Sequence, residues 1–344
     1  MTFEYAELKS RVLAHFGVPS LRALVPTAVM RIKFVTLAVL FFAVYGNLLR
    51  QPDPSYGLVF VSGAALVFLA SGLMLNSLHD LIHGTLFRRR WLRTSASYLS
   101  DLLGASHLIW HNRHNRCHHY HTNDADRDED LQTGGILRFS TLHPKYGFHR
   151  YQAWYAPIGY FLYGVMWFYG ADLEKFLRGR TMEVKLKGFT PLHAVLFWVF
   201  KFLHVFVFVY LPYKTWGMGG VFGYFVVASL VGMSVASVNN IAHVFTGAHY
   251  HSTAAFSSRD AFVLSQIRTT ACFSPENRFT SFMMGGVNHQ LVHHLFPDVP
   301  HAYHPDIYVI LKRYAEECGV RLHSSPSLFA AVRGHYAELA RLGR

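Results

Sequence analysis

Four long apolar segments constrain the fold of this chain more than any other feature of its sequence. They cover residues 34–49, 57–75, 192–211 and 221–238. Lys201 is the one Lys, Arg, Asp or Glu inside them. About 20 apolar residues in a helix cross a hydrocarbon core roughly 30 Å thick. Only 15% of all residues are charged, against about 25% in ordinary soluble domains. The sequence therefore predicts an all-α integral membrane protein with four transmembrane helices.

Basic residues gather at the ends of these segments and account for the formal net charge of +12. Arg31 and Lys33 precede the first segment, 88–90 follow the second, and five basic residues within 175–187 precede the third. Such a distribution indicates basic loops on the cytoplasmic side of a membrane. The basic residues form no groove-reading motif and no run interleaved with stacking aromatics, so we expect no nucleic-acid partner.

The order of the apolar segments predicts a topology. The first two form a hairpin that returns the chain to its starting side. Segment 153–170 contains Pro157 and many Tyr and Trp side chains, a composition typical of the bilayer interface, so we expect it not to cross. Four crossings then place both termini and two cap regions, 79–187 and 243–344, in the cytoplasm. No internal repeat or long linker divides residues 1–344, which we expect to form a single domain.

Three histidine clusters lie beside the apolar segments. The first is HDLIH at 79–83, and the other two have the form HxxxHH at 114–119 and 289–294. Helical residues four apart lie on one face, so each cluster directs two or three imidazoles at one point. Neutral imidazole is the commonest metal ligand in proteins, and the clusters hold too many for one tetrahedral zinc. The clusters therefore predict a site for two metals. Imidazole suits iron, copper, nickel and zinc about equally, so these residues alone leave the metal open.

Polar residues next to the clusters suggest how the imidazoles are oriented. Asp80 lies beside a histidine of the first cluster and could orient an imidazole N–H. An acidic run at 124–130 follows the second cluster and is interpreted as a solvated loop. Before the third cluster, Gly285 and Gly286 predict a turn, and Asn288 predicts the N-cap of the helix that follows.

Several longer motifs follow one another over nearly the whole chain. They are HDLIHG (79–84), HHYHTN (118–123), NNIAH (239–243), IRTTACFSPENR (267–278) and GGVNHQLVHHLFP (285–297). In sequence and order they resemble the membrane fatty acid desaturase family, and most closely its bacterial linoleoyl-CoA and front-end members. The resemblance implies transmembrane helices with a cytoplasmic helical cap, and two iron ions bound almost wholly by histidine.

The resemblance also implies a set of iron ligands, which are by position His79, His83, His114, His118, His119, His243, Gln290, His293 and His294. His289 is the alternative to Gln290. Family position favours the glutamine, whereas imidazole is chemically the better ligand. The two differ by about 100° around a helix, so only one is expected to face the metal. Asn239 is implied to approach an iron through water. The sequence departs from the family at Val292, where glutamate is usual, and at His121, where tyrosine is common.

A reaction follows from the same resemblance. It is the oxygen-dependent insertion of a cis double bond into a long-chain fatty acyl substrate, which is an acyl-CoA or an acyl-lipid, with O2 as cosubstrate. The sequence has no HPGG haem motif. We therefore expect no fused cytochrome b5 domain, and a separate electron donor of the ferredoxin or cytochrome b5 type. We expect a multi-pass protein among membrane lipids, with a cytoplasmic active site, in a bacterial inner membrane rather than the endoplasmic reticulum.

Other functions stay open at this point. A related membrane di-iron hydroxylase or ketolase, acting on a lipid or hydrocarbon, would carry the same clusters and leave oxygen on the carbon. A membrane metal or haem binder without catalysis is a second alternative, although haem needs one or two axial histidines rather than three clusters. A transporter is disfavoured, because the apolar segments contain few ionisable residues.

Overall fold

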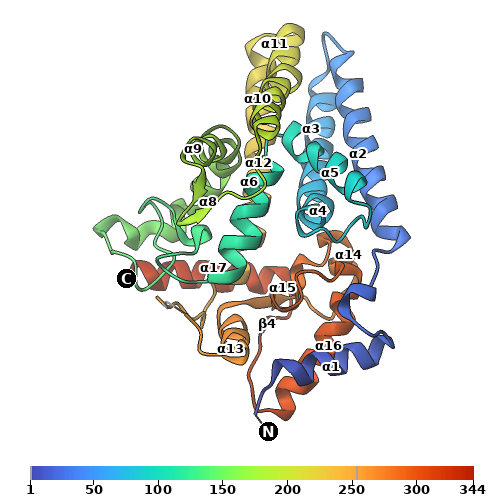
Figure 1. Ribbon diagram of the computed structural model, residues 1–344. Coiled ribbons are helices and arrows are strands. Elements are labelled where there is room, and N and C mark those ends of the chain that lie inside the picture. Colours follow the sequence, from blue (N-terminus) through green and yellow to red (C-terminus); the bar gives the residue numbers. More distant parts are fainter. Residues whose placement is uncertain (1, 253–254) are drawn as a thin grey trace.

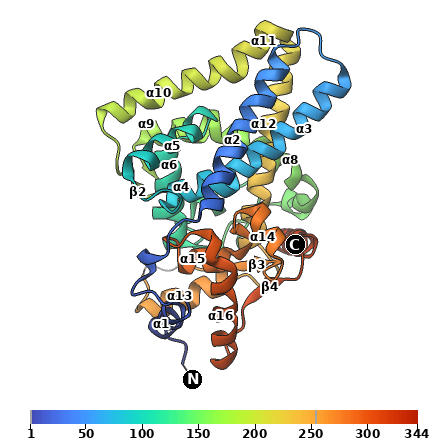
Figure 2. The same cartoon turned by 90° about the vertical axis from the view of Figure 1, so that its right-hand side faces the viewer.

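The computed structural model describes residues 2–252 and 255–344 as a mostly helical molecule. Long helices fill the upper half of Figure 1, and shorter helices fill the lower half, where both termini lie. Turning the molecule by 90° shows that α10 is strongly tilted against the other long helices (Figure 2). The two halves meet at the level of the histidine clusters.

Among the described residues, four helical runs are long and apolar enough to cross a membrane. They are α2 (Ala28–Leu49), then α3 (Tyr56–Gly72) with η2 (Leu73–Leu78) and α4 (His79–His83), then α10 (Pro191–Val205) with η7 (Phe206–Tyr210) and α11 (Leu211–Trp216), and α12 (Met218–His243). Each contains one predicted segment, which confirms the all-α fold with four such helices. The second and fourth continue beyond the predicted ends to His83 and His243, and so carry histidines to the boundary between the two halves.

The starts of three of these helices follow from local sequence. Thr27, Ser55 and Thr190 are their N-caps, and each side chain accepts a hydrogen bond from the backbone amide three residues on. Such caps satisfy amides that have no partner within the helix. Pro191 follows at the first helical position, where its missing N–H is not needed.

Four turns in these helices and their neighbours are π-helical. They are η2, η3 (Asn112–His118), η6 (Met166–Ala171) and η7. The second histidine cluster lies largely in η3, so our expectation of regular α-helical spacing is wrong there. A π-turn carries more residues per turn than an α-helix and is frequent at functional sites. Here it widens the turn that presents His114 and His118.

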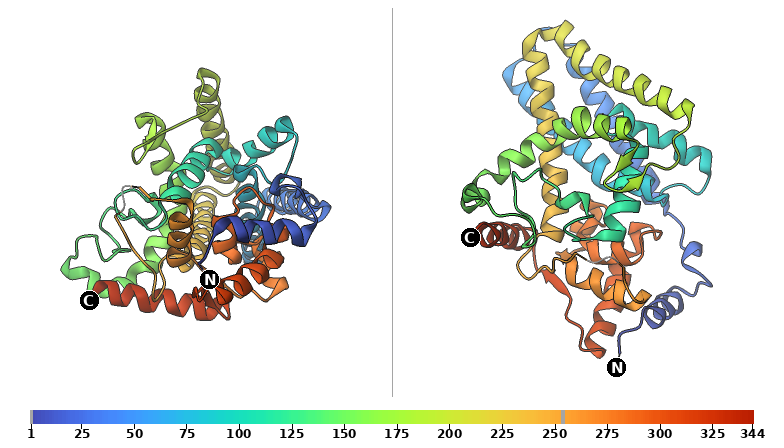
Figure 3. Two further views of the ribbon diagram at one scale, coloured as in Figure 1. Left: turned by 60° about the horizontal axis from the view of Figure 1, so that its bottom comes forward. Right: turned by 60° about the vertical axis from the view of Figure 1, so that its left-hand side comes forward.

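The predicted interfacial segment 153–170 forms one continuous helical run. It consists of α8 (Gln152–Val165), η6 and α9 (Asp172–Arg178), and it is not among the four candidate membrane helices found in the described residues. Figure 3 shows α8 lying against α12. The contact is close, because a Cβ on Gly164 would lie 2.5 Å from the carbonyl oxygen of Ala228, and one on Gly232 would lie 2.2 Å from the Gly164 nitrogen. Small residues thus let the two helices touch.

The remaining elements are shorter than the spans; most lie in the lower half of Figure 1, whereas two of the helices named next, α5 and α6, lie beside the long helices. The helices are α1 (Tyr5–Phe16), α5 (Arg90–Leu102), α6 (His107–His111), α7 (His119–His121), α13 (Arg259–Thr269), α14 (Arg278–Met284), α15 (Gln290–Leu295), α16 (His304–Glu317) and α17 (Leu328–Gly343). Short 3-10 helices are η1 (Leu21–Ala23), η4 (Glu129–Leu131), η5 (Gly147–Tyr151), η8 (Val287–His289) and η9 (His301–Tyr303). Strands β1 (Arg180–Thr181) and β2 (Val184–Lys185) pair antiparallel, and β3 (Ala271–Phe273) and β4 (His323–Ser325) pair parallel.

Of the apolar cores formed by the described residues, the two largest adjoin the histidine clusters. One joins the long helices and includes Phe41, Leu78 and Phe208. The other lies in the lower half and includes Leu291 and Leu311. Buried apolar surface is the main favourable term in folding, so the two cores fix the elements that carry the histidines.

Candidate metal centre

Imidazoles from separate elements converge between the two halves of the molecule. The Nε2 atom of His114 lies 3.1 Å from that of His79, 3.2 Å from that of His119 and 3.4 Å from that of His293. The Nε2 atoms of His119 and His293 are 3.0 Å apart. His83 joins His79, His114 and His293 in a set whose ligand atoms all lie within 4.8 Å of one another. These five histidines form the first histidine group.

This spacing fits a metal better than hydrogen bonds between the rings. A neutral imidazole has one donor and one acceptor nitrogen, so four converging Nε2 atoms cannot all satisfy one another. Nitrogen ligands 2.0–2.1 Å from a metal lie about 3 Å apart when neighbouring. The residues of the first group therefore match a metal ion held by histidine.

A second histidine group lies beside the first. It consists of His118, His243 and His294, all buried and with ligand atoms within 4.8 Å of one another. The side-chain nitrogen of Gln290 lies 3.4 Å from Nε2 of His243. Within the described part of the chain, Nε2 of His118 and Nε2 of His294 are buried without a hydrogen-bond partner. Both atoms are thus free to bind a metal.

Hydrogen bonds on the opposite ring nitrogens fix two rings of the second group, those of His118 and His294. Nδ1 of His118 lies 3.0 and 3.1 Å from the two carboxylate oxygens of Asp128, and Nδ1 of His294 lies 2.9 Å from Oε1 of Gln266. Such partners hold Nδ1 as the donor and leave Nε2 for the metal. Asp128 is fully buried, so our interpretation of the acidic run as a solvated loop is wrong. Asp124 is buried as well, whereas Asp126 stays exposed, and Asp128 folds inward because its carboxylate meets the His118 ring and the Asn123 amide.

Asp130 lies close to both groups, but on the Nδ1 side of the His118 ring rather than on the Nε2 side that is free for a metal. It falls within 4.8 Å of His114 and His118, yet its carboxylate lies 3.6 Å from Nδ1 of His118, the nitrogen that faces Asp128. The side chain of Asn239 donates a hydrogen bond of 3.1 Å to Asp130. We conclude that Asp130 is not placed as a third partner of these histidines around one ion.

Burial keeps most of these histidines neutral. For His114, His119, His293 and His294, burial and the neighbouring imidazoles hold the pKa well below the ordinary value of 6.5. Burial also acts to lower the pKa of His118, but the carboxylates of Asp128 and Asp130 outweigh it and raise that pKa. Neutral imidazole is the form that binds metals.

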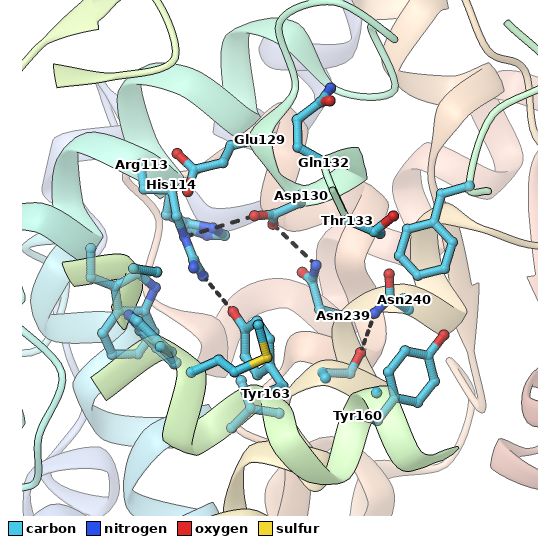
Figure 4. Close-up of a pocket in the computed structure, with 18 of the residues that line it drawn as sticks. Arg113, His114, Glu129, Asp130, Gln132, Thr133, Tyr160, Tyr163, Asn239 and Asn240 are labelled. Atoms are coloured by element: carbon cyan, nitrogen blue, oxygen red, sulfur yellow. Dashed lines mark hydrogen bonds and ion pairs between the residues drawn. The ribbon is translucent and has the colours of Figure 1, made fainter. Parts of the chain in front are cut away.

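A cavity of about 940 Å³ reaches the two groups, a volume within the range of ligand-binding pockets. His79, His114 and Gln290 form part of its wall. Much of the rest is apolar, including Leu75, Trp110, Met166, Trp167, Ile136, Leu137 and Phe139. Figure 4 shows polar side chains on the wall near the histidines, with Arg113, Asp130 and Tyr163 facing one another. The cavity thus joins a largely apolar space to a candidate metal centre.

Comparison with known proteins gives the family. The family model described as fatty acid desaturase matches residues 55–326. The chain belongs to the fatty acid desaturase family. It is 30% identical over 285 residues to an acyl-lipid (8-3)-desaturase of Physcomitrium patens, which covers 80% of this chain and 58% of that protein. It is 29% identical over 284 residues to an sn-1 linoleoyl-lipid 6-desaturase of Arthrospira platensis, covering 80% of this chain and 76% of the relative. A Delta(5) fatty acid desaturase A of Dictyostelium discoideum is 25% identical over 354 residues, covering 98% of this chain and 75% of the relative.

In this desaturase, the third cluster presents Gln290 rather than His289 to the centre. Nε2 of His289 lies 2.9 Å from Oγ of Ser281, and its ring lies beside Tyr308. The cluster is not one regular helix, because η8 ends at His289 and α15 begins at Gln290. Asn288 does not cap α15 as expected. Its side chain instead donates a hydrogen bond of 3.1 Å to Oγ of Ser281.

Asp80 and Asn239 lie near the centre, and each contacts a side chain outside the two histidine groups. Oδ2 of Asp80 lies 2.6 Å from Nδ1 of His301, so the imidazole that it orients belongs to neither histidine group. Asn239 contacts Asp130 rather than a histidine. Val292, at the family's glutamate position, is completely buried. Its side chain packs in the apolar core of the lower half.

Sequence reasoning missed several residues that support the centre. The pairing of Asp128 with His118 could have been suspected from their separation of ten residues in one motif. Gln266 and His301 gave no signal, because their partners lie 28 and 221 residues away. Arg113, a cavity residue immediately before the second cluster, was also missed.

Proposed function

We propose that this desaturase binds two iron ions, one at each histidine group. The proposed ligands are His79, His83, His114, His119 and His293 in the first group, and His118, His243, His294 and Gln290 in the second. The single observation that carries the proposal is the convergence of Nε2 atoms at 3.0–3.4 Å beside a large cavity. Iron bound there would supply the oxidising chemistry, with O2, that removes hydrogen from an unactivated methylene pair.

The chain's own residues would bind and orient the substrate. We propose a long-chain fatty acyl substrate, esterified as an acyl-lipid or acyl-CoA, with its hydrocarbon part along the apolar wall. The wall residues Leu75, Trp110 and Trp167 exclude water from the methylenes next to the histidines. Asp128 and Gln266 hold the ligand rings in place. The names of the relatives, which include acyl-lipid and linoleoyl-lipid desaturases, support this substrate class.

Two electrons per turnover would come from a separate ferredoxin or cytochrome b5 type donor. We propose that all histidine-bearing ends and both cap regions lie in the cytoplasm, as in a bacterial inner membrane, and that residues 1–344 act as one unit. The support is the shared location of the histidine-bearing helix ends at one side of the four candidate spans. The basic residues flanking the spans agree with this side.

The test is expression in a host together with such a donor, followed by lipid analysis. The wild type should give a new cis alkene and contain about two irons per chain. His118→Ala and His293→Ala should abolish product and lower iron content while the protein still inserts, because neither residue lies in a span. The matched control is His15→Ala, which removes an exposed histidine of α1. A new alcohol without alkene would indicate a hydroxylase instead, and one tightly held zinc without iron would overturn the proposal.

A further inference from the structure

The wall of the large cavity changes character along the helical run from α8 through η6 to α9. The residues that α8 and the start of η6 contribute to this wall are uncharged, and they include Gly159, Tyr160, Tyr163 and Met166. The residues that α9 contributes are mostly charged, and they are Glu174, Lys175 and Arg178. Arg180 of β1 follows them on the same wall. Along this run the cavity therefore passes from an uncharged end to a charged end, as a lipid does from its chain to its head group.

Most charges at the charged end have partners within the chain, and Arg180 has none. Lys175 lies 2.7 Å from Glu129, and Arg178 lies 3.0 Å from Glu174. Among the residues that the structure describes, Arg180 makes no ion pair and no side-chain hydrogen bond, and it is exposed. One guanidinium at the rim of the cavity is thus available to a ligand.

The short hairpin of β1 and β2 adds a second positive charge beside Arg180. Arg180 lies directly opposite Lys185 in the antiparallel pair, so both side chains leave the same face of the hairpin. That face is exposed, whereas Thr181 on the other face is fully buried. The one carboxylate of the hairpin, Glu183, lies in the turn that joins the strands. Like charges directly opposite each other destabilise a strand pair, and an anion bound between them would remove that cost.

The outer face of the same helical run shows where such an anion would come from. Exposed apolar side chains recur at every fourth residue of it, from Trp154, which is 85% exposed, through Ile158 and Leu162 to Met166, which is 57% exposed. The opposite face packs on α12, a candidate span, through Gly164. Figure 1 shows α9 beside the long helices. An exposed apolar stripe next to a membrane helix is the surface that lipid chains cover.

The cavity reaches this outer face at two neighbouring turns of the run. Met166 and Gly170 both line the cavity, and both are exposed. We call these two residues the side opening. A lipid in the bilayer can pass its chain through the side opening, while its head group stays at the polar boundary where the basic hairpin lies.

We propose that Arg180 and Lys185 bind the phosphate of a membrane phospholipid, whose acyl chain enters the cavity from the bilayer through the side opening. The inference rests on the proposed function, since it assumes that the cavity holds the acyl chain. An esterified chain has no charge of its own, so the anion has to belong to the head group. The planar guanidinium and the ammonium group together suit a phosphate. The substrate is then drawn from the bilayer and not from water-soluble acyl-CoA.

Binding of paired lipids to the iron-loaded protein tests the phosphate site without using activity. The probes are dilinoleoyl phosphatidylglycerol and dilinoleoylglycerol, which has the same chains and no phosphate, in a nonionic detergent at low salt. The wild type should bind the phospholipid roughly tenfold or more tightly, the size expected for two basic residues near a lipid surface. Arg180→Gln combined with Lys185→Gln should bind both lipids alike. The preference of the wild type should shrink as salt is added, because both side chains are exposed.

Control variants separate this site from the general attraction between a basic protein and an anionic lipid. Arg89→Gln combined with Arg90→Gln removes the same charge from exposed positions at the start of α5, outside the cavity wall. This variant should keep the full preference for the phospholipid. Arg180→Lys keeps the charge without the planar donor geometry, so it should lose only part of the preference.

A substitution at the side opening tests the route of the acyl chain. A Cβ added to Gly170 meets nothing within 4 Å, so Gly170→Trp should fold while its indole fills the opening. Phosphatidylglycerol with a photoreactive diazirine on its acyl chain, placed in vesicles of the same lipid, should label the cavity wall of the wild type. Gly170→Trp should lose most of this label. Gly223→Trp, at an exposed glycine of α12 that does not line the cavity, should be labelled like the wild type.

The possible outcomes separate this inference from the proposed function. Equal binding of the two lipids by the wild type would overturn the phosphate site, as would a preference that persists in the folded Arg180 and Lys185 double variant. Undiminished labelling of Gly170→Trp would overturn entry from the bilayer. Dependence on Arg180 and Lys185 that is seen with linoleoyl-CoA, but not with phosphatidylglycerol, would overturn the phospholipid as the ligand. A wild type that binds phospholipid as expected and makes no alkene would count against the proposed function alone.

Discussion

At the scale of single residues, the partners of the two ring nitrogens distinguish the roles that we propose for the histidines. His118 and His289 are both buried and both belong to an HxxxHH motif. His118 has Nδ1 against Asp128 and leaves Nε2 free, whereas His289 uses Nε2 on Ser281. Membership of the same kind of motif therefore does not give two histidines the same role. The partner of the second nitrogen, which comes from elsewhere in the fold, separates them.

Separate alanine substitutions of the two neighbouring residues Gln290 and His289 test this distinction. We expect Gln290→Ala to lower iron content and activity by tenfold or more, because Gln290 lies beside His243 in the second group. His289→Ala should keep iron, because it removes only a contact with Ser281 and some packing against Tyr308. Iron analysis and product yield measure both variants. Greater iron loss in His289→Ala than in Gln290→Ala would reverse the assignment.

At the scale of elements, apolar length could be predicted from the sequence and long-range partners could not. The four spans could be predicted because the length and apolar composition of a single segment decide whether its helix can cross a membrane. The π-turn at η3 and the inward fold of Asp128 depend on distant elements, so no local pattern marks them. The same holds for Gln266 and His301, which reach the centre from other helices. The histidines themselves were found because their spacing is local.

The contact between α8 and α12 can be tested by adding one methyl group. Gly164→Ala should destabilise the protein by about 1–3 kcal/mol, because the new Cβ would lie 2.5 Å from a backbone oxygen of α12. The control is Gly223→Ala on α12 itself, where a Cβ meets nothing within 4 Å. Thermal unfolding in one detergent compares them. Equal midpoints for the two variants would show that α8 does not pack so closely on α12.

At the scale of the whole molecule, the buried histidines couple stability to pH. In the metal-free protein, burial lowers the pKa of four of them, His114, His119, His293 and His294, below the ordinary 6.5. The unfolded chain then binds more protons as the pH falls through 6.5, and the folded state loses stability. His118, with its raised pKa, opposes this as a single group.

We therefore expect the metal-free protein to be most stable above pH 6.5 and to weaken as the pH falls towards 5. Each of the four histidines contributes a slope of about 1.4 kcal/mol per pH unit between its unfolded and folded pKa. Unfolding midpoints of chelator-treated protein across this range measure the effect. Stability that stays level or rises on acidification would contradict it.

The arrangement of the four spans also predicts where the chain ends lie. The His83 end of the second span and the His243 end of the fourth span both enter the half of the molecule that holds the two termini (Figure 1). An even number of crossings is required for this arrangement, so the run from α8 to α9 must stay on the same side.

Single cysteines placed near Arg180 and Arg344, after replacement of the partly exposed Cys318, should both be labelled from the cytoplasm. A cysteine at Gln51, in the loop between α2 and α3, should be labelled from the other side. Label at Arg180 from that other side would mean that α8 and α9 cross the bilayer, and the four-span topology would then be wrong.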